Sequence, residues 1–191
     1  VHVYDLTRQM LIATLDDPET SEGMTHRDFV HSVSISANGT IATGGFREGI
    51  SPQIATAHGY KVVTDRTELS AVASTNASHI SGQFGYGNMG FEYDHRTGRT
   101  NFYNEHPHLS EMAMSAIGLL AKDPDGFFLM VESSRIDHAG HQNSLERLIH
   151  EVLEFDRTVE QVVTWAAQRG NTAVIATADH ETGGLEVLRS G

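Results

Sequence analysis

The chain has 191 residues, 39% of them hydrophobic and 20% charged, which is typical of a folded globular protein rather than a disordered one. Its formal net charge of −12 at pH 7 disfavours nucleic acids and anionic membrane surfaces as partners. The lack of cysteine excludes disulfides and thiolate metal sites, so a metal site would have to use His, Asp or Glu. No apolar run approaches the roughly 20 residues that a membrane span needs, so we expect none.

Residues 1–49 predict a β-rich N-terminal segment of uncertain origin, which we separate from a domain at residues 50–191. Alternating apolar residues predict strands over 1–6 and 29–35. A third strand is expected directly after the Asn38-Gly39 turn, because this dipeptide favours the tight turn of a β-hairpin.

The order of His, Asp, aliphatic and Gly residues between 26 and 45 resembles one blade of a WD-type β-propeller. A lone blade cannot bury its own faces, and the chain contains no second copy of the pattern. An ordinary hairpin at the edge of a larger sheet therefore stays open as the alternative interpretation.

Residues 50–108 carry weaker patterns. We expect a short helix that ends at Gly59, a strand over 60–64 and a further helix that begins at Arg66. Residues 81–108 are rich in Gly, Asn, His and Tyr and show no clear periodicity. We therefore expect one long loop there, and long loops in compact domains are often functional.

The second half of the chain predicts regular elements. Apolar residues at helical spacing predict a helix over 109–120, and an apolar run predicts a buried strand over 126–131. A long helix over 144–169 and a second buried strand over 171–177 follow. Strand, helix and strand in this order predict a parallel pair with a right-handed crossover.

The helix predicted over 144–169 is amphipathic. We expect its apolar residues to be buried: Leu145, Leu148, Val152, Phe155, Val159, Val162 and Ala166. Its charged residues, Glu151 and Glu154 among them, are expected to form a solvated face.

An acidic and histidine-containing segment follows each of the two predicted buried strands. Glu132, Asp137 and His141 follow the first strand. Asp179 and His180 follow the second. Ligands of parallel sheets bind outside the carboxyl ends of the strands, so we expect these five side chains to converge. Because grouped carboxylates repel one another unless cations hold them, a divalent metal site is the simplest explanation.

The spacing suggests which ions would suit which residues. Asp137 and His141 are four residues apart, so on a helix they share one face, and zinc accepts both ligand types. Glu132, a carboxylate expected among oxygen ligands and water, suits magnesium better. Taken one at a time, the motifs have simpler interpretations: an ion pair of Asp137 with His141, a helix cap at Asp179, or a pair of Glu132 with Arg135.

Residues from about 50 to 188 resemble the middle-to-late part of an alkaline phosphatase. The segments that carry the resemblance are Asp65-Arg-Thr-Glu-Leu69, Pro107-His-Leu-Ser-Glu-Met112, Gly126-Phe-Phe-Leu-Met-Val-Glu132, Arg135-Ile-Asp-His-Ala-Gly-His141 and Thr177-Ala-Asp-His-Glu-Thr-Gly-Gly184. The resemblance implies an α/β fold, a largely parallel sheet flanked by helices, of which this chain forms only part.

The resemblance also implies a phosphomonoesterase with two zinc ions and one magnesium ion. By matching position, Asp137 and His141 would bind the first zinc, Asp179 and His180 the second, and Glu132 the magnesium. Phosphomonoester small molecules would be the substrates. Analogy with the family leads us to expect a periplasmic or secreted protein and makes a homodimer a candidate assembly.

The chain departs from the family pattern in the parts that perform catalysis. The family's serine nucleophile lies in an Asp-Ser-Ala segment, and the chain contains no such segment. A further zinc-binding His of the family is also not found, so the catalytic residues stay unassigned. A phosphodiesterase or sulfatase of the same superfamily, or a non-catalytic fragment or binding module, therefore remain as alternatives.

Overall fold

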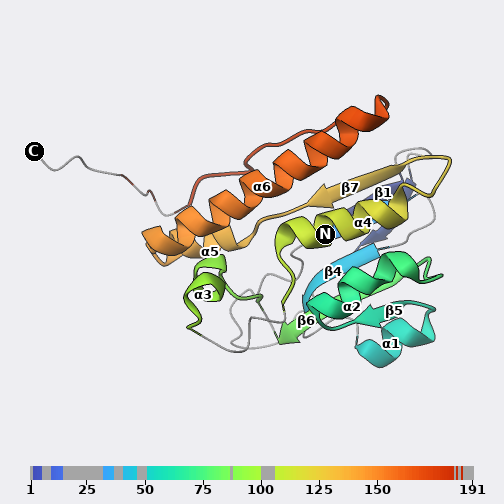
Figure 1. The fold of residues 1–191 in the computed structure, drawn as a ribbon, viewed down its shortest axis with the longest axis horizontal. Helices are drawn as coiled ribbons and strands as arrows, with labels where there is room; N and C mark the ends of the chain where they lie inside the picture. Colours follow the sequence, from blue (N-terminus) through green and yellow to red (C-terminus); the bar gives the residue numbers. More distant parts are fainter. Residues whose placement is uncertain are drawn as a thin grey trace, which may run out of the picture.

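The computed structural model describes residues 51–86, 88–99, 106–182, 184 and 186, with only the backbone of four strands before them (Figure 1). These strands are β1 (His2–Asp5), β2 (Met10–Thr14), β3 (Ser32–Ser36) and β4 (Ile41–Phe46). β1 and β2 form a separate antiparallel pair. β3 and β4 form an antiparallel pair within the main sheet, which agrees with the turn predicted between them.

The main sheet has five strands in the order β5-β6-β4-β3-β7. The three later strands are β5 (Lys61–Val63), β6 (Ile80–Tyr86) and β7 (Phe127–Val131). β6 pairs in parallel with β4 and β5, whereas β3 runs antiparallel to both β4 and β7. All strands of this sheet except β3 therefore share one direction, and the prediction of a largely parallel α/β sheet is confirmed.

Helices of the described residues pack beside this sheet. They are α1 (Pro52–Ala57), α2 (Arg66–Ala71), α3 (Glu92–Thr97), α4 (Leu109–Leu120), α5 (Arg135–His141) and α6 (Leu145–Arg169), with a 3-10 turn at Val72–Ser74. Figure 1 shows α4 and α6 side by side, with β7 next to them. None of these helices has the length and apolar character that crossing a membrane would require.

The core lies between the sheet and α4. Its buried members include Val63, Leu69, Val72, Ile80, Phe84, Met112, Ala116 and Leu120. Phe127, Leu129 and Val131 of β7 pack against this cluster, while Phe128 and Met130 are exposed. This alternation is the period of two that a strand with one covered face produces.

Several elements from residue 60 onward agree with the sequence predictions. The predicted strands over 60–64 and 126–131 are present as β5 and β7, and the predicted helices over 109–120 and 144–169 as α4 and α6. α6 ends at Gly170, whose φ of 73° lies in the left-handed region that glycine enters without steric cost.

The prediction of a single long loop over 81–108 is wrong. Its first six residues all belong to β6, which lies inside the sheet between β5 and β4, and α3 follows after a short connection. Ile80 and Phe84 of β6 are fully buried, but Gly82 and Gly85 weaken the alternating pattern in the sequence. Residues 87 and 100–105 lie outside the described residues.

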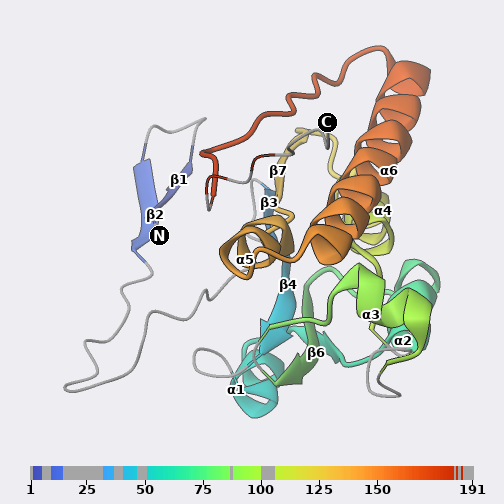
Figure 2. The same cartoon turned by 90° about the vertical axis from the view of Figure 1, so that its left-hand side faces the viewer.

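The prediction of a strand over 171–177 is also wrong, and so is the parallel pair that we expected between this strand and β7. This segment has no helix or strand, and it runs back from the end of α6 toward α5 (Figure 2). Ile175, in its middle, is 89% exposed. β7 pairs instead with β3, and no described strand occupies its other edge. Apolar β-branched residues favour an extended chain, but a strand also needs a partner edge.

The charged face of α6 is not wholly solvated, contrary to expectation. Glu151 and Glu154 are each 5% exposed. Glu151 accepts a hydrogen bond of 2.7 Å from the Glu92 N–H at the start of α3, and Glu154 accepts one of 3.0 Å from the Ser110 N–H at the start of α4. The first N–H groups of a helix lack partners within the helix, and carboxylates satisfy them while complementing the helix dipole. α6 thus caps two helices with two acids on one face.

The packing of α6 leaves several of its apolar residues in solvent. Exposed residues on this helix are Leu145, Ile149, Val152, Leu153 and Val163. Leu145 and Val152 belong to the stripe expected to be buried, so this part of the prediction is wrong. The reason is tertiary: the capping contacts turn the two glutamates inward, and the helix cannot also bury the residues on its opposite side.

The resemblance of residues 26–45 to a propeller blade is not supported. β3 and β4 are inner strands of the main sheet, where β3 pairs with β7 and β4 with β6. The hairpin is therefore part of the α/β sheet. The division of the chain at residue 49 stays a prediction.

Candidate metal centre

Asp137 and His141 lie on α5, which begins shortly after β7 ends. The helix places them one turn apart, with His141 Nε2 at 3.5 Å from Asp137 Oδ1. His141 is exposed and Asp137 half-buried. The expected helical spacing is therefore present, and both side chains can be reached from solvent.

Asp179 and His180 follow α6 in the irregular segment, and both are exposed. The Asp179 side chain accepts a hydrogen bond of 3.0 Å from the His180 N–H, and its second oxygen lies 3.3 Å from His180 Nε2. His180 Nδ1 lies 2.9 Å from the Glu181 carbonyl oxygen. This backbone hydrogen bond raises the pKa of His180, and the charge of Asp179 adds to the effect. The two adjacent side chains can face one point because no regular strand holds them apart.

Thr182 connects the two motif segments. Its hydroxyl donates a hydrogen bond of 2.5 Å to Asp137 Oδ1 and lies 3.1 Å from His180 Nδ1. A single side chain therefore contacts one candidate ligand from each segment. The structure brings Asp137, His141 and His180 into one neighbourhood, with Asp179 beside His180.

Gly140 makes the approach of the two segments possible. A Cβ atom at this position would lie 3.1 Å from the Thr182 carbonyl oxygen and 3.3 Å from the Thr182 Cβ. These distances are shorter than ordinary van der Waals contact, so a larger residue would displace Thr182. Sequence reasoning singled out neither residue, although a glycine inside a predicted helix is a signal of close backbone approach.

Glu132 directly follows β7 and is exposed. It lies on the short connection that leads from this strand into α5, three residues before the helix begins. Arg135, its expected alternative partner, stacks over the Phe91 ring at 3.6 Å and lies 3.0 Å from His138 Nδ1. The role of Glu132 as a magnesium ligand stays a prediction.

Comparison with known proteins connects this geometry to one family. The family model described as alkaline phosphatase matches residues 33–189. Repressible alkaline phosphatase of Saccharomyces cerevisiae is 36% identical over 146 residues, which are 71% of this chain and 25% of the relative. Alkaline phosphatase 3 of Bacillus subtilis is 37% identical over 133 residues, which are 70% of this chain and 27% of the relative.

Solved structures point the same way. Thermus thermophilus alkaline phosphatase matches with a TM-score of 0.59 and 30% identity, over 69% of this chain and 28% of that chain. The cold-active alkaline phosphatase of a Shewanella species matches with a TM-score of 0.56 and 25% identity, over 70% of this chain and 31% of that chain. The chain spans about a quarter of the length of the curated relatives named above. With most of its residues matched by the family model and its motif segments in contact, the chain belongs to the alkaline phosphatase family.

Proposed function

We propose that this chain is part of a metal-dependent phosphomonoester hydrolase, to which it contributes metal ligands. Asp137 and His141 would hold one zinc ion, Asp179 and His180 a second, and Glu132 a magnesium ion. The observation that carries the proposal is the contact of Thr182 with both Asp137 and His180, because it joins two segments that are far apart in the sequence.

The donor set fits the ions that the family resemblance implies. Imidazole nitrogens and carboxylate oxygens are the zinc ligands that remain in a chain without cysteine. The candidate ligands are exposed or half-buried, so an ion and a phosphoryl group can reach them. When bound, the ions would supply positive charge that stabilises the transferring phosphoryl group.

The residues around the candidate ligands orient them. The hydroxyl of Thr182 holds Asp137 Oδ1, which fixes the rotamer of that carboxylate. His180 Nδ1 faces the Glu181 carbonyl oxygen, so Nε2 is the nitrogen left to face an ion. The nucleophile is not assigned to any residue of this chain, since the sequence lacks the Asp-Ser-Ala segment in which the family carries it.

Zinc binding and hydrolysis of p-nitrophenyl phosphate at alkaline pH test the proposal together. Asp179→Ala should lower zinc affinity about tenfold or more, whereas Glu181→Ala, two residues further along the chain and also exposed, should leave it unchanged. Equal losses from both variants would contradict the ligand assignment. Faster turnover of bis-p-nitrophenyl phosphate than of the monoester would contradict the substrate class and favour a phosphodiesterase.

A further inference from the structure

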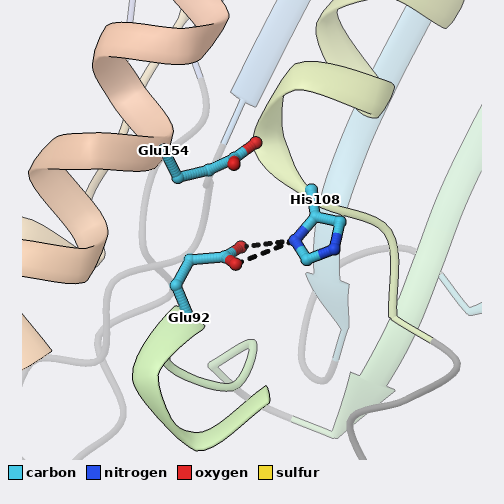
Figure 3. Close-up of side chains that lie close together, drawn as sticks. All are labelled: Glu92, His108 and Glu154. Atoms are coloured by element: carbon cyan, nitrogen blue, oxygen red, sulfur yellow. Dashed lines mark hydrogen bonds and ion pairs between the residues drawn. The ribbon is translucent and has the colours of Figure 1, made fainter. Parts of the chain in front are cut away.

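A second group of acidic and histidine side chains lies where α3, α4 and α6 meet, and it shares no residue with the candidate metal centre. Figure 3 shows three side chains that point toward one another. Glu92 lies on α3, His108 directly precedes α4, and Glu154 lies on α6. One nitrogen or oxygen atom from each lies within 4.8 Å of the others. Three elements therefore deliver possible ligand atoms to one point.

The contacts within this group are short and shielded from solvent. His108 Nδ1 lies 2.8 Å from one carboxylate oxygen of Glu92 and 3.0 Å from the other. Glu92 is 8% exposed and Glu154 5% exposed. Burying carboxylates in this way is unfavourable unless opposite charge compensates them.

Negative charge exceeds positive charge in the contacts of this cluster. Glu92 and Glu154 are both carboxylates, and both are buried. His108 offers a single positive charge at most. The guanidinium of Arg157, on a largely exposed side chain, lies 3.9 Å from a carboxylate oxygen of Glu154. A cation of higher charge would balance the group better than one imidazolium does.

A second observation concerns Ser110, whose N–H donates to Glu154. The serine is 1% exposed, and its Oγ has no hydrogen-bond partner within the described ranges of the chain. Buried hydroxyl groups in native proteins nearly always have a partner. The Ser110 hydroxyl, on the residue whose N–H binds Glu154, is therefore consistent with a further ligand bound at this cluster.

We propose that Glu92, His108 and Glu154 form a second divalent-cation site, which ties α3, α4 and α6 together, and that Zn²⁺ is its preferred ion. One imidazole and two carboxylates suit zinc, whereas calcium and magnesium prefer oxygen ligands alone. The ion would take the place of the proton that His108 shares with Glu92. The role is structural, and it does not depend on the function proposed above.

The test counts zinc bound by the full chain after removal of metals by chelator. The background variant carries Asp137→Asn and Asp179→Asn, so that the candidate metal centre no longer competes. In this background we expect one zinc ion per chain and a rise in melting temperature on zinc addition. If the background variant neither bound zinc nor gained melting temperature, the proposal would be overturned, even if the wild-type chain bound zinc at the candidate metal centre.

Two glutamine variants and a matched control locate the ion. In Glu154→Gln the carboxamide oxygen can still accept the Ser110 N–H, and in Glu92→Gln the backbone contact with Glu151 persists. Each should lower zinc affinity about tenfold or more. Glu160→Gln, an exposed position on the same helix with the same charge change, should have no effect. Zinc binding by both cluster variants as tight as that of the control would overturn the proposal.

Discussion

The two acidic and histidine-containing groups of this chain differ in their access to solvent. Asp137, His141, Asp179 and His180 lie on a short helix and an irregular segment, mostly exposed, whereas Glu92 and Glu154 are buried between helices. Exposed ion pairs contribute little to stability, whereas breaking a buried network is costly. The first group should therefore affect binding and activity, and the second should affect the free energy of unfolding.

The largest effect on stability is expected from Glu154→Ala. The substitution removes the acceptor of the Ser110 N–H at the start of α4 and leaves this group buried without a partner. The free energy of unfolding should fall by about 3 kcal/mol, measured by urea denaturation. Glu160→Ala, exposed on the same helix, should change it by less than about 0.5 kcal/mol. Similar values for the two variants would contradict the buried capping role.

Glu151→Gln should change how stability depends on pH. Burial raises the pKa of Glu151 from 4.5 to about 7, against the opposing hydrogen bond from the Glu92 N–H. The folded protein thus keeps a proton that the unfolded chain has lost, so stability falls as the pH rises from about 4.5 to about 7. Without this charge, the variant should be more stable than wild type by about 2 kcal/mol at pH 8.

Urea denaturation at several pH values in chelator-containing buffer measures this difference. The free energy of unfolding of the variant should still decline with pH, but less than that of the wild type. The hydrogen bond to Glu92 raises the pKa of His108, and the stabilisation that this gives is lost as the pH rises above 6.5. Parallel curves for wild type and Glu151→Gln would show that this carboxyl is ionised in the folded protein at pH 5.

Gly140→Ala tests the exposed centre with little change in stability. The added methyl group would lie too close to Thr182 and displace the segment that carries Asp179 and His180. Zinc affinity should fall about tenfold, measured by titration of the metal-free protein. Gly118→Ala on α4 is the control, because its Cβ meets nothing within 4 Å. That variant should bind zinc normally and be more stable by about 0.5–1 kcal/mol.

The smallest effect is expected at Thr182. Thr182→Val keeps the shape of the side chain but loses the hydrogen bond to Asp137, so zinc affinity should fall by a factor of about five, corresponding to about 1 kcal/mol. Thr182→Ser retains the hydroxyl and should bind zinc like wild type. If the serine variant lost as much affinity as the valine variant, the hydroxyl would not be the orienting group.

The sequence predicted elements where one local pattern was sufficient. Helical spacing identified α4 and α6, and Gly170 marked where α6 ends, because these features depend on neighbours within a few residues. The same spacing placed Asp137 and His141 on one helical face, as α5 shows. These features needed no knowledge of the rest of the fold.

Features that depend on distant partners were not predicted. The burial of Glu151 and Glu154 requires the N-termini of α3 and α4 to meet α6, and no local pattern encodes this. For the same reason, an apolar run was insufficient to make a strand at 171–177, and β6 was concealed by its glycines. Thr182 and Gly140 were overlooked because their importance lies in a contact across the fold.

Anomalous diffraction at the zinc absorption edge, from crystals grown with zinc, would test the central claim most directly. That claim is that the segments carrying Asp137 and His180 jointly hold metal ions next to Thr182. We predict anomalous peaks within coordination distance of Asp137 and His141, and of Asp179 and His180, at about 2 Å from the ligand atoms. Zinc-loaded crystals with no peak at either pair of residues would contradict the account.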